Sequence, residues 1–186
     1  NINNFICDHI KLFSLSPRFI KMYVEYCIND TELTNSNKNV FGRVFEINLV
    51  NRIRRYSSDA DIDEFSFLLE EIAYQIHFNE KYPLLVSDLI SIIDKYNKEY
   101  GVHVNIQKFC QTMIDAKVLV EEDNGYYFYK ESFLAYFVAK SLNTRYNNGE
   151  GKDELLTLIK NICFNINGDI LLFLPYITSN LNILSG

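Results

Sequence analysis

The sequence predicts a mainly α fold that contains a single β-hairpin. Only seven Gly and three Pro occur in 186 residues, and so few helix breakers favour helices over an all-β fold. Apolar residues recur at helical spacing along most of the chain. The alternating pattern of strands appears only in one short stretch, at residues 118–128.

Residues 1–58 are expected to form a small helical subdomain. An amphipathic helix is predicted over 2–13, and Ser16-Pro17 opens a second helix, because Ser is a favoured N-cap and Pro suits the first helical position. A third helix follows over about 39–56, and the polar run 57–59 is the expected boundary. The apolar face of this third helix comprises Val40, Phe41, Val44, Phe45, Leu49 and Ile53.

A second subdomain is expected over residues 59–146. Its first helix is predicted to begin with a capping box formed by Asp61 and Glu64. Two more helices are predicted, over 85–100, where Gly101 ends the helix, and over 105–116. The residues expected to face inward from these helices include Phe65, Leu68, Leu69, Ile72, Ala73, Ile76, Leu85, Leu89, Ile92, Ile93, Tyr96, Ile106, Phe109, Cys110, Met113 and Ile114.

The hairpin is predicted from a change of period. Val118 and Val120 alternate with polar residues, as do Tyr126 and Phe128. Between these pairs lies Asp123-Asn124-Gly125, and Asn-Gly is a strong signal for a tight hairpin because both residues tolerate positive φ. Three helices followed by a hairpin is the order of a winged-helix domain with one wing.

The remaining chain is predicted to be helical. A helix over 131–146 leaves the wing directly, with Phe133, Leu134, Phe137, Val138 and Leu142 facing inward. Residues 147–186 are expected to start a C-terminal helical region. It consists of a polar linker over 147–152 and helices over 153–166 and 168–185.

Composition disfavours several classes of protein. The net charge is −6, and residues 61–130 carry six Lys and no Arg against thirteen Asp and Glu, a net −7, so nucleic acid is an unlikely partner for this chain. No run of about 20 apolar residues predicts a membrane span. The cysteines lack metal-site spacing, and we expect them to be buried, reduced thiols in a cytoplasmic protein: Cys7, Cys27, Cys110 and Cys163.

Residues 126–139 resemble the end of the winged-helix domain in STAND-type, NACHT-like NTPases. That family typically shows Phe-x-His-x-Ser-Phe-x-Glu-Tyr-Phe-x-Ala at this place. Lys130 stands where His is usual, and Ala135 stands where Glu is usual. A second segment, 16–20, is similar to the short proline motif that opens the family's first helical subdomain. The residues that match the first motif are Phe128, Ser132, Phe133, Tyr136, Phe137 and Ala139.

The resemblance implies a nucleotide-driven switch in a longer parent protein. In the family the motif proline, here Pro17, lies against the nucleotide, and the residue at the position of Lys130 contacts the phosphates of ADP. The expected cofactors of the parent are therefore ATP and ADP, and the expected partner is an upstream nucleotide-binding domain of the same chain. Oligomerisation on activation and, in prokaryotes, defence against phage are also implied.

The fragment itself is not expected to be an enzyme. No Gly-x-x-x-x-Gly-Lys-Ser/Thr phosphate loop occurs in it, and such a loop would be needed to cradle the phosphates of ATP. The sequence predicts no catalytic residue and no metal ligand. Each of the two site residues also has a simpler explanation. Pro17 would then be only a helix-starting proline, and Lys130 only a solvated lysine at a helix start.

Two alternative functions remain open from the sequence. The first is a DNA-binding winged helix whose recognition helix, 105–116, would expose side chains able to read bases: Gln107, Lys108, Gln111 and Thr112. The charge of this region opposes that function. The second is a helical protein-interaction scaffold, which the C-terminal helices favour.

Overall fold

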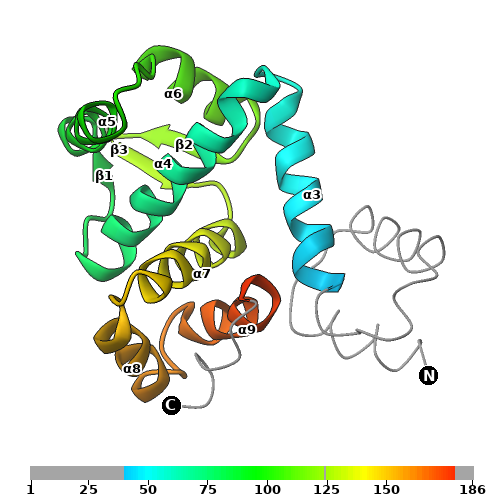
Figure 1. Ribbon diagram of the computed structural model, residues 1–186, viewed down its shortest axis with the longest axis vertical. Coiled ribbons are helices and arrows are strands. Elements are labelled where there is room, and N and C mark those ends of the chain that lie inside the picture. Colours follow the sequence, from blue (N-terminus) through cyan, green and yellow to red (C-terminus); the bar gives the residue numbers. More distant parts are fainter. Residues whose placement is uncertain (1–39, 124, 179–186) are drawn as a thin grey trace.

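The computed structural model describes residues 40–123 and 125–178, which form seven helices and one small antiparallel sheet (Figure 1). The mainly helical class is thus confirmed. The helices predicted over 2–13 and from Ser16-Pro17 lie outside the described residues. The elements are α3 (Val40–Arg54), α4 (Asp59–Phe78), β1 (Leu84–Leu85), α5 (Val86–Tyr100), α6 (Ile106–Asp115), β2 (Leu119–Glu122), β3 (Gly125–Phe128), α7 (Glu131–Asn147), α8 (Lys152–Lys160) and α9 (Asn167–Ile177).

The start of α4 differs from the predicted capping box. Ser58 is the N-cap, in extended conformation, and Asp61 is the third helical residue. The Asp61 carboxylate accepts hydrogen bonds from the Ser58 backbone N–H, at 3.2 Å, and from the Ser58 hydroxyl. The prediction that Asp61 caps the helix and Glu64 completes the box was therefore wrong by three residues, because Ser58-x-x-Asp61 fits the same pattern.

A strand that the sequence did not predict completes the sheet. The strand order is β1-β3-β2, and β1 pairs antiparallel with β3 through Leu84–Tyr126 and Leu85–Gly125. Leu84 is fully buried, whereas Leu85 is 49% exposed. Leu85 was predicted to face inward from a helix, and that was wrong because it lies in a strand whose successive side chains point to opposite faces.

The predicted hairpin of β2 and β3 is confirmed, but Gly125 serves a different purpose from the expected one. The strands pair from Leu119–Phe128 to Glu122–Gly125, and Asp123 in the turn has φ +48°. Gly125 is the first residue of β3 and is buried. A Cβ on Gly125 would lie 2.5 Å from Cβ of Pro83, so glycine is required there because β1 approaches closely.

Helix α5 ends at Gly101 as the sequence predicts, and α6 begins close to the predicted residue 105. Gly101 is the C-cap of α5, in left-handed conformation with φ +66°. Asn105 is the N-cap of α6, and its side chain accepts a hydrogen bond from the Lys108 N–H. Thr112 of α6 is only 4% exposed. It is therefore not one of the exposed, base-reading side chains that the sequence suggested.

Helix α7 is the centre of the described structure. In Figure 1 it lies between α4 on one side and α8 and α9 on the other. Phe45 of α3 packs against rings of α7 and α9, with centroid distances of 5.1 Å to Tyr136 and 4.9 Å to Phe173. Because α7 is covered from several sides, most of its first three turns are buried: Phe133, Ala135, Tyr136, Phe137, Val138, Ala139, Ser141 and Leu142.

The C-terminal helices are shorter than predicted. The helix expected over 153–166 begins at Lys152 and ends at Lys160, where Asn161 is the C-cap. The helix expected over 168–185 runs from Asn167 to Ile177, and the residues after 178 lie outside the described part. Cys163, between these helices, is exposed, and Cys110 is partly buried. The expectation of buried cysteines is therefore wrong for Cys163.

Within residues 40–123 and 125–178, no helix combines the length and apolar character required to cross a membrane.

Candidate functional site

Lys130 lies at the junction between the sheet and the central helix. It is the N-cap of α7, in extended conformation, and its carbonyl oxygen accepts a hydrogen bond of 3.0 Å from the Phe133 N–H. Its side chain is exposed and has no hydrogen bond or ion pair with any other residue that the structure describes. Pro17, the other predicted nucleotide contact, lies outside the described residues.

Two further cations lie near the start of α7. The Tyr129 N–H donates to the Val118 carbonyl at 2.9 Å, which continues the hairpin ladder to the residues next to Lys117 and Lys130. Arg52, in the last turn of α3, donates through Nη1 to the carbonyl oxygen of Lys117 at 3.3 Å. Its guanidinium carbon is 5.6 Å from the ring centroid of Phe133. Arg52 and Lys117 therefore place positive charge near the start of α7, where Glu131 in the first turn adds one negative charge.

A polar network crosses the interface between α4 and α7. Lys140 Nζ lies 3.1 Å from the Ser66 hydroxyl, 3.4 Å from Glu46 Oε1 and 3.5 Å from Glu70 Oε1. The Thr144 hydroxyl donates to Glu70 Oε2 at 3.2 Å. Burial raises the pKa of Glu70, and the nearby Lys140 ammonium partly opposes that effect. One buried carboxylate is thus held between helices by a cation and a hydroxyl group.

Arg145 organises the next turn of the same interface. Its Nη2 pairs with Glu71 Oε2 at 2.7 Å, and its guanidinium stacks 3.7 Å from the centroid of the Tyr74 ring. The Tyr74 hydroxyl donates to Glu154 of α8 at 2.6 Å. Burial first, and then this hydrogen bond, raises the pKa of Tyr74 to about 12. Three helices are therefore joined around one guanidinium group.

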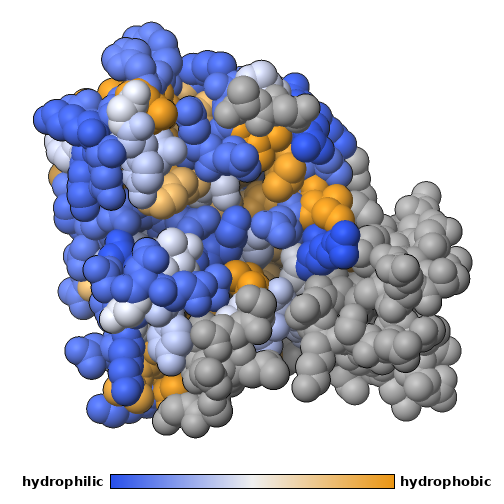
Figure 2. All heavy atoms as spheres, in the orientation of Figure 1, coloured by the Kyte–Doolittle hydropathy of each residue, from blue (hydrophilic) through white to orange (hydrophobic). Residues whose placement is uncertain are grey.

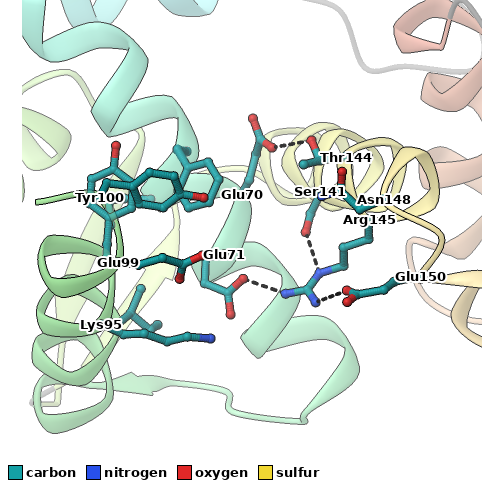
Figure 3. Close-up of a pocket in the computed structure, with 14 residues that line it drawn as sticks. Glu70, Glu71, Lys95, Glu99, Tyr100, Ser141, Thr144, Arg145, Asn148 and Glu150 are labelled. Atoms are coloured by element: carbon teal, nitrogen blue, oxygen red, sulfur yellow. Dashed lines mark hydrogen bonds and ion pairs between the residues drawn. The ribbon is translucent and has the colours of Figure 1, made fainter.

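A cleft of about 300 Å³ opens beside this network, between α4, α5 and α7 (Figure 3). One wall is aromatic: the Phe67 ring centroid is 5.0 Å from that of Tyr96 and 5.4 Å from that of Tyr100. The opposite wall carries Arg145 and its partners. The lining residues are Phe67, Leu68, Glu70, Glu71, Ile92, Lys95, Tyr96, Glu99, Tyr100, Ser141, Thr144, Arg145, Asn148 and Glu150.

Residues 82–138 match the family model described as Novel STAND NTPase 4. This match supports a relation between the chain and the STAND NTPases. The matched segment runs from the residue before Pro83 through the sheet, α5 and α6 into α7, and it includes Lys130. It covers less than half of the chain. Comparison with the curated proteins and with the solved structures gave no match.

The matched segment therefore contributes Lys130 and two of the three rings of the aromatic wall, Tyr96 and Tyr100, but the cleft itself was not predicted. Glu70 and Glu71 come from α4, before the matched residues, and Arg145 comes after them. A weak signal was present in the sequence, since Lys140 and Thr144 are polar residues one turn apart on a helix otherwise rich in apolar residues. The arrangement itself depends on packing between helices that are distant in sequence.

The structure indicates no metal centre among the residues it describes, where no group of three or more His, Cys, Asp and Glu side chains gathers. His77 is partly buried against Phe78, with ring centroids 4.7 Å apart, and burial lowers its pKa. Asp61 is bound to Lys108, whose Nζ is 2.7 Å away; this hydrogen bond is the main cause of its lowered pKa. Neither arrangement presents a free acid–base pair to a substrate.

Proposed function

We propose that this chain is the regulatory part of a larger STAND-type, NACHT-like NTPase. It would hold the nucleotide-binding core in its resting state and relay activation to the rest of the protein. The family match over residues 82–138 carries this proposal. The proposal includes a cytoplasmic setting, assembly of the parent on activation and a role in signalling or antiphage defence, as the resemblance implies.

The order of elements supports a winged-helix domain within this regulatory part. The sequence of elements α4, β1, α5, α6, β2, β3 produces a sheet of order β1-β3-β2. Helices α5 and α6 follow the first strand, and the β2–β3 hairpin forms a wing. We propose that residues 59–146 are this domain, that 1–58 are a helical subdomain, and that 147–186 begin a C-terminal helical region.

In this proposal Lys130 faces the phosphates of ADP or ATP bound to the upstream domain. Its ammonium group is exposed and has no carboxylate partner among the described residues, so it is free to meet an anion. Arg52 binds the carbonyl oxygen of Lys117 and lies over the Phe133 ring in the first turn of α7, so both cations are near the same helix end. Pro17 would contact the same nucleotide from the first helical subdomain.

The test uses the longer parent protein with ADP bound. Lys130→Ala is expected to accelerate ADP release by about tenfold, the effect of losing one charged hydrogen bond, and Pro17→Ala is expected to accelerate it less. Lys98→Ala, a charge change of the same size at an exposed position of α5 outside the cleft, is the control and should leave the rate unchanged. Retention of ADP at the wild-type rate in Lys130→Ala would remove this residue from the site.

DNA binding by the winged helix is less well supported. Lys108, the only cation among the proposed base-reading residues, is bound to Asp61, and Gln111 donates to Asp115 at 3.0 Å. Thr112 is buried. A gel-shift assay of the chain at low salt should therefore show no complex with duplex DNA, and clear binding would favour the alternative.

One observation favours a protein-interaction role for the C-terminal helices. Apolar side chains are exposed on α8 and just after it, where Figure 2 shows an apolar patch at the lower end of the molecule. Exposed apolar patches commonly mark packing partners. This patch is compatible with a helical array continuing beyond α9. The exposed apolar residues of this segment are Leu156, Ile159, Ile162 and Phe164.

A further inference from the structure

We propose that the cleft between α4, α5 and α7 binds a small organic cation, of the class of linear alkylammonium ions and polyamines. This site is separate from the proposed nucleotide contact at Lys130. Its volume of about 300 Å³ lies at the lower end of the range for small-molecule sites. An extended alkylammonium chain suits a partly open cleft of this size.

The charges of the lining residues select a cation. Four carboxylates line the cleft, those of Glu70, Glu71, Glu99 and Glu150, together with two cations, Lys95 and Arg145. Lys140 lies 3.5 Å from Glu70 and offsets its charge, so these seven groups together carry one net negative charge. Arg145 is already paired with Glu71 at 2.7 Å and lies 3.8 Å from Glu150. An anion such as phosphate would therefore approach an excess of negative charge, whereas an ammonium group would reduce it.

Glu99 is the carboxylate most available to a ligand. It is exposed on α5 at the cleft and has no hydrogen bond or ion pair among the described residues. Lys95 lies one turn before it on the same helix, but the two side chains do not form an ion pair in the described structure. On a helix, a Lys four residues before a Glu forms a weaker ion pair than a Glu four residues before a Lys.

The aromatic wall supplies the second half of the recognition. Tyr96 and Tyr100 lie with ring centroids 4.8 Å apart, and both are close to Phe67. The faces of such rings attract cations through the ring quadrupole. The neighbouring interface between α4 and α7 already contains this interaction, since Arg145 stacks on Tyr74 at 3.7 Å. A cation between Glu99 and Tyr100 would therefore meet a charge and a ring face together.

The test titrates the chain with spermidine and follows backbone amide NMR signals of α5 and α7 at low ionic strength. We expect saturable shifts that weaken as salt is added. Glu99→Gln and Tyr100→Leu should each weaken binding about two- to fivefold. Tyr100→Phe keeps the ring face and should bind like the wild type. Asp94→Asn removes an exposed acid of α5 that does not line the cleft, so it should also bind normally.

Three results would overturn the proposal. The first is the absence of saturable shifts with spermidine. The second is equal weakening by Asp94→Asn and Glu99→Gln, which would indicate a diffuse counterion effect rather than a site. The third is displacement of spermidine from the cleft residues by inorganic phosphate. Lys130→Ala should not alter spermidine binding. Failure of the proposed cation site can therefore be distinguished from failure of the proposed nucleotide contact.

Discussion

The substitution Gly125→Ala tests the pairing of β1 with β3, on which the winged-helix assignment depends. The added Cβ would lie 2.5 Å from Cβ and 2.8 Å from Cγ of Pro83. Carbon atoms in ordinary contact are about 3.5–4.0 Å apart, so β1 must move by about 1 Å. Hydrogen bonds of the ladder do not tolerate such a shift. Leu84, which is fully buried, would move with the strand.

Overpacking of this kind costs about 1–3 kcal/mol, and for a chain of this size the melting temperature should fall by about 3–10 °C. Thermal unfolding followed by circular dichroism measures the loss, and amide exchange at Leu84 and Tyr126 localises it. Gly101→Ala is the control: nothing lies within 4 Å of its Cβ, and φ is +66°. It should cost about 1 kcal/mol from left-handed strain without changing exchange in the sheet. Wild-type stability and exchange in Gly125→Ala would refute the close packing of β1.

Two further predictions concern α4. Ser58→Ala should cost about 1 kcal/mol of unfolding free energy in urea denaturation, whereas Glu64→Gln should cost nothing measurable; equal losses would contradict the observed cap. Burial raises the pKa of Glu70, so the folded state holds its proton more readily than the unfolded state does. The protonated Glu70 carboxyl contributes fully to the unfolding free energy below the ordinary pKa of a carboxyl group. This contribution is lost as the pH rises through the pKa of Glu70 in the folded state. Glu70→Gln should therefore flatten the decline of stability between acidic and neutral pH, while Glu122→Gln, at an exposed residue, should retain it. If the unfolding free energy of Glu70→Gln declined with pH as steeply as that of the wild type, the Glu70 carboxyl would not be the cause of the decline.

Local patterns were sufficient to predict most helices. The inward face of α3 is an example, because Val44, Phe45, Leu49 and Ile53 are all buried as their spacing predicts. The end of α5 was predicted from Gly101 alone, because glycine readily adopts the left-handed conformation that ends many helices. This signal is also local in the sequence. The hairpin was predicted because Asn-Gly and the flanking alternation lie within a few residues of one another.

The features that were missed depend on contacts between distant segments. Strand β1 has only two residues, too few to show an alternating pattern, and it exists because β3 pairs with it. The burial of Ala135 and Ala139 was also missed, because a one-sided helical pattern does not anticipate a helix covered by α4 and by α9. The cleft needs three helices at once, so no single stretch of sequence contains it.

The central position of α7 connects the two proposed sites. Its N-terminus carries Lys130 beside the hairpin, and its last turns carry Thr144 and Arg145 in the cleft. The same helix packs against α9, and the Tyr74–Glu154 hydrogen bond adds α8 to this assembly. A rigid helix of this kind moves as one body. A shift caused by nucleotide at Lys130 would therefore reach the cleft and the C-terminal helices together, and a cation that ties α5 to α4 and α7 would oppose that shift.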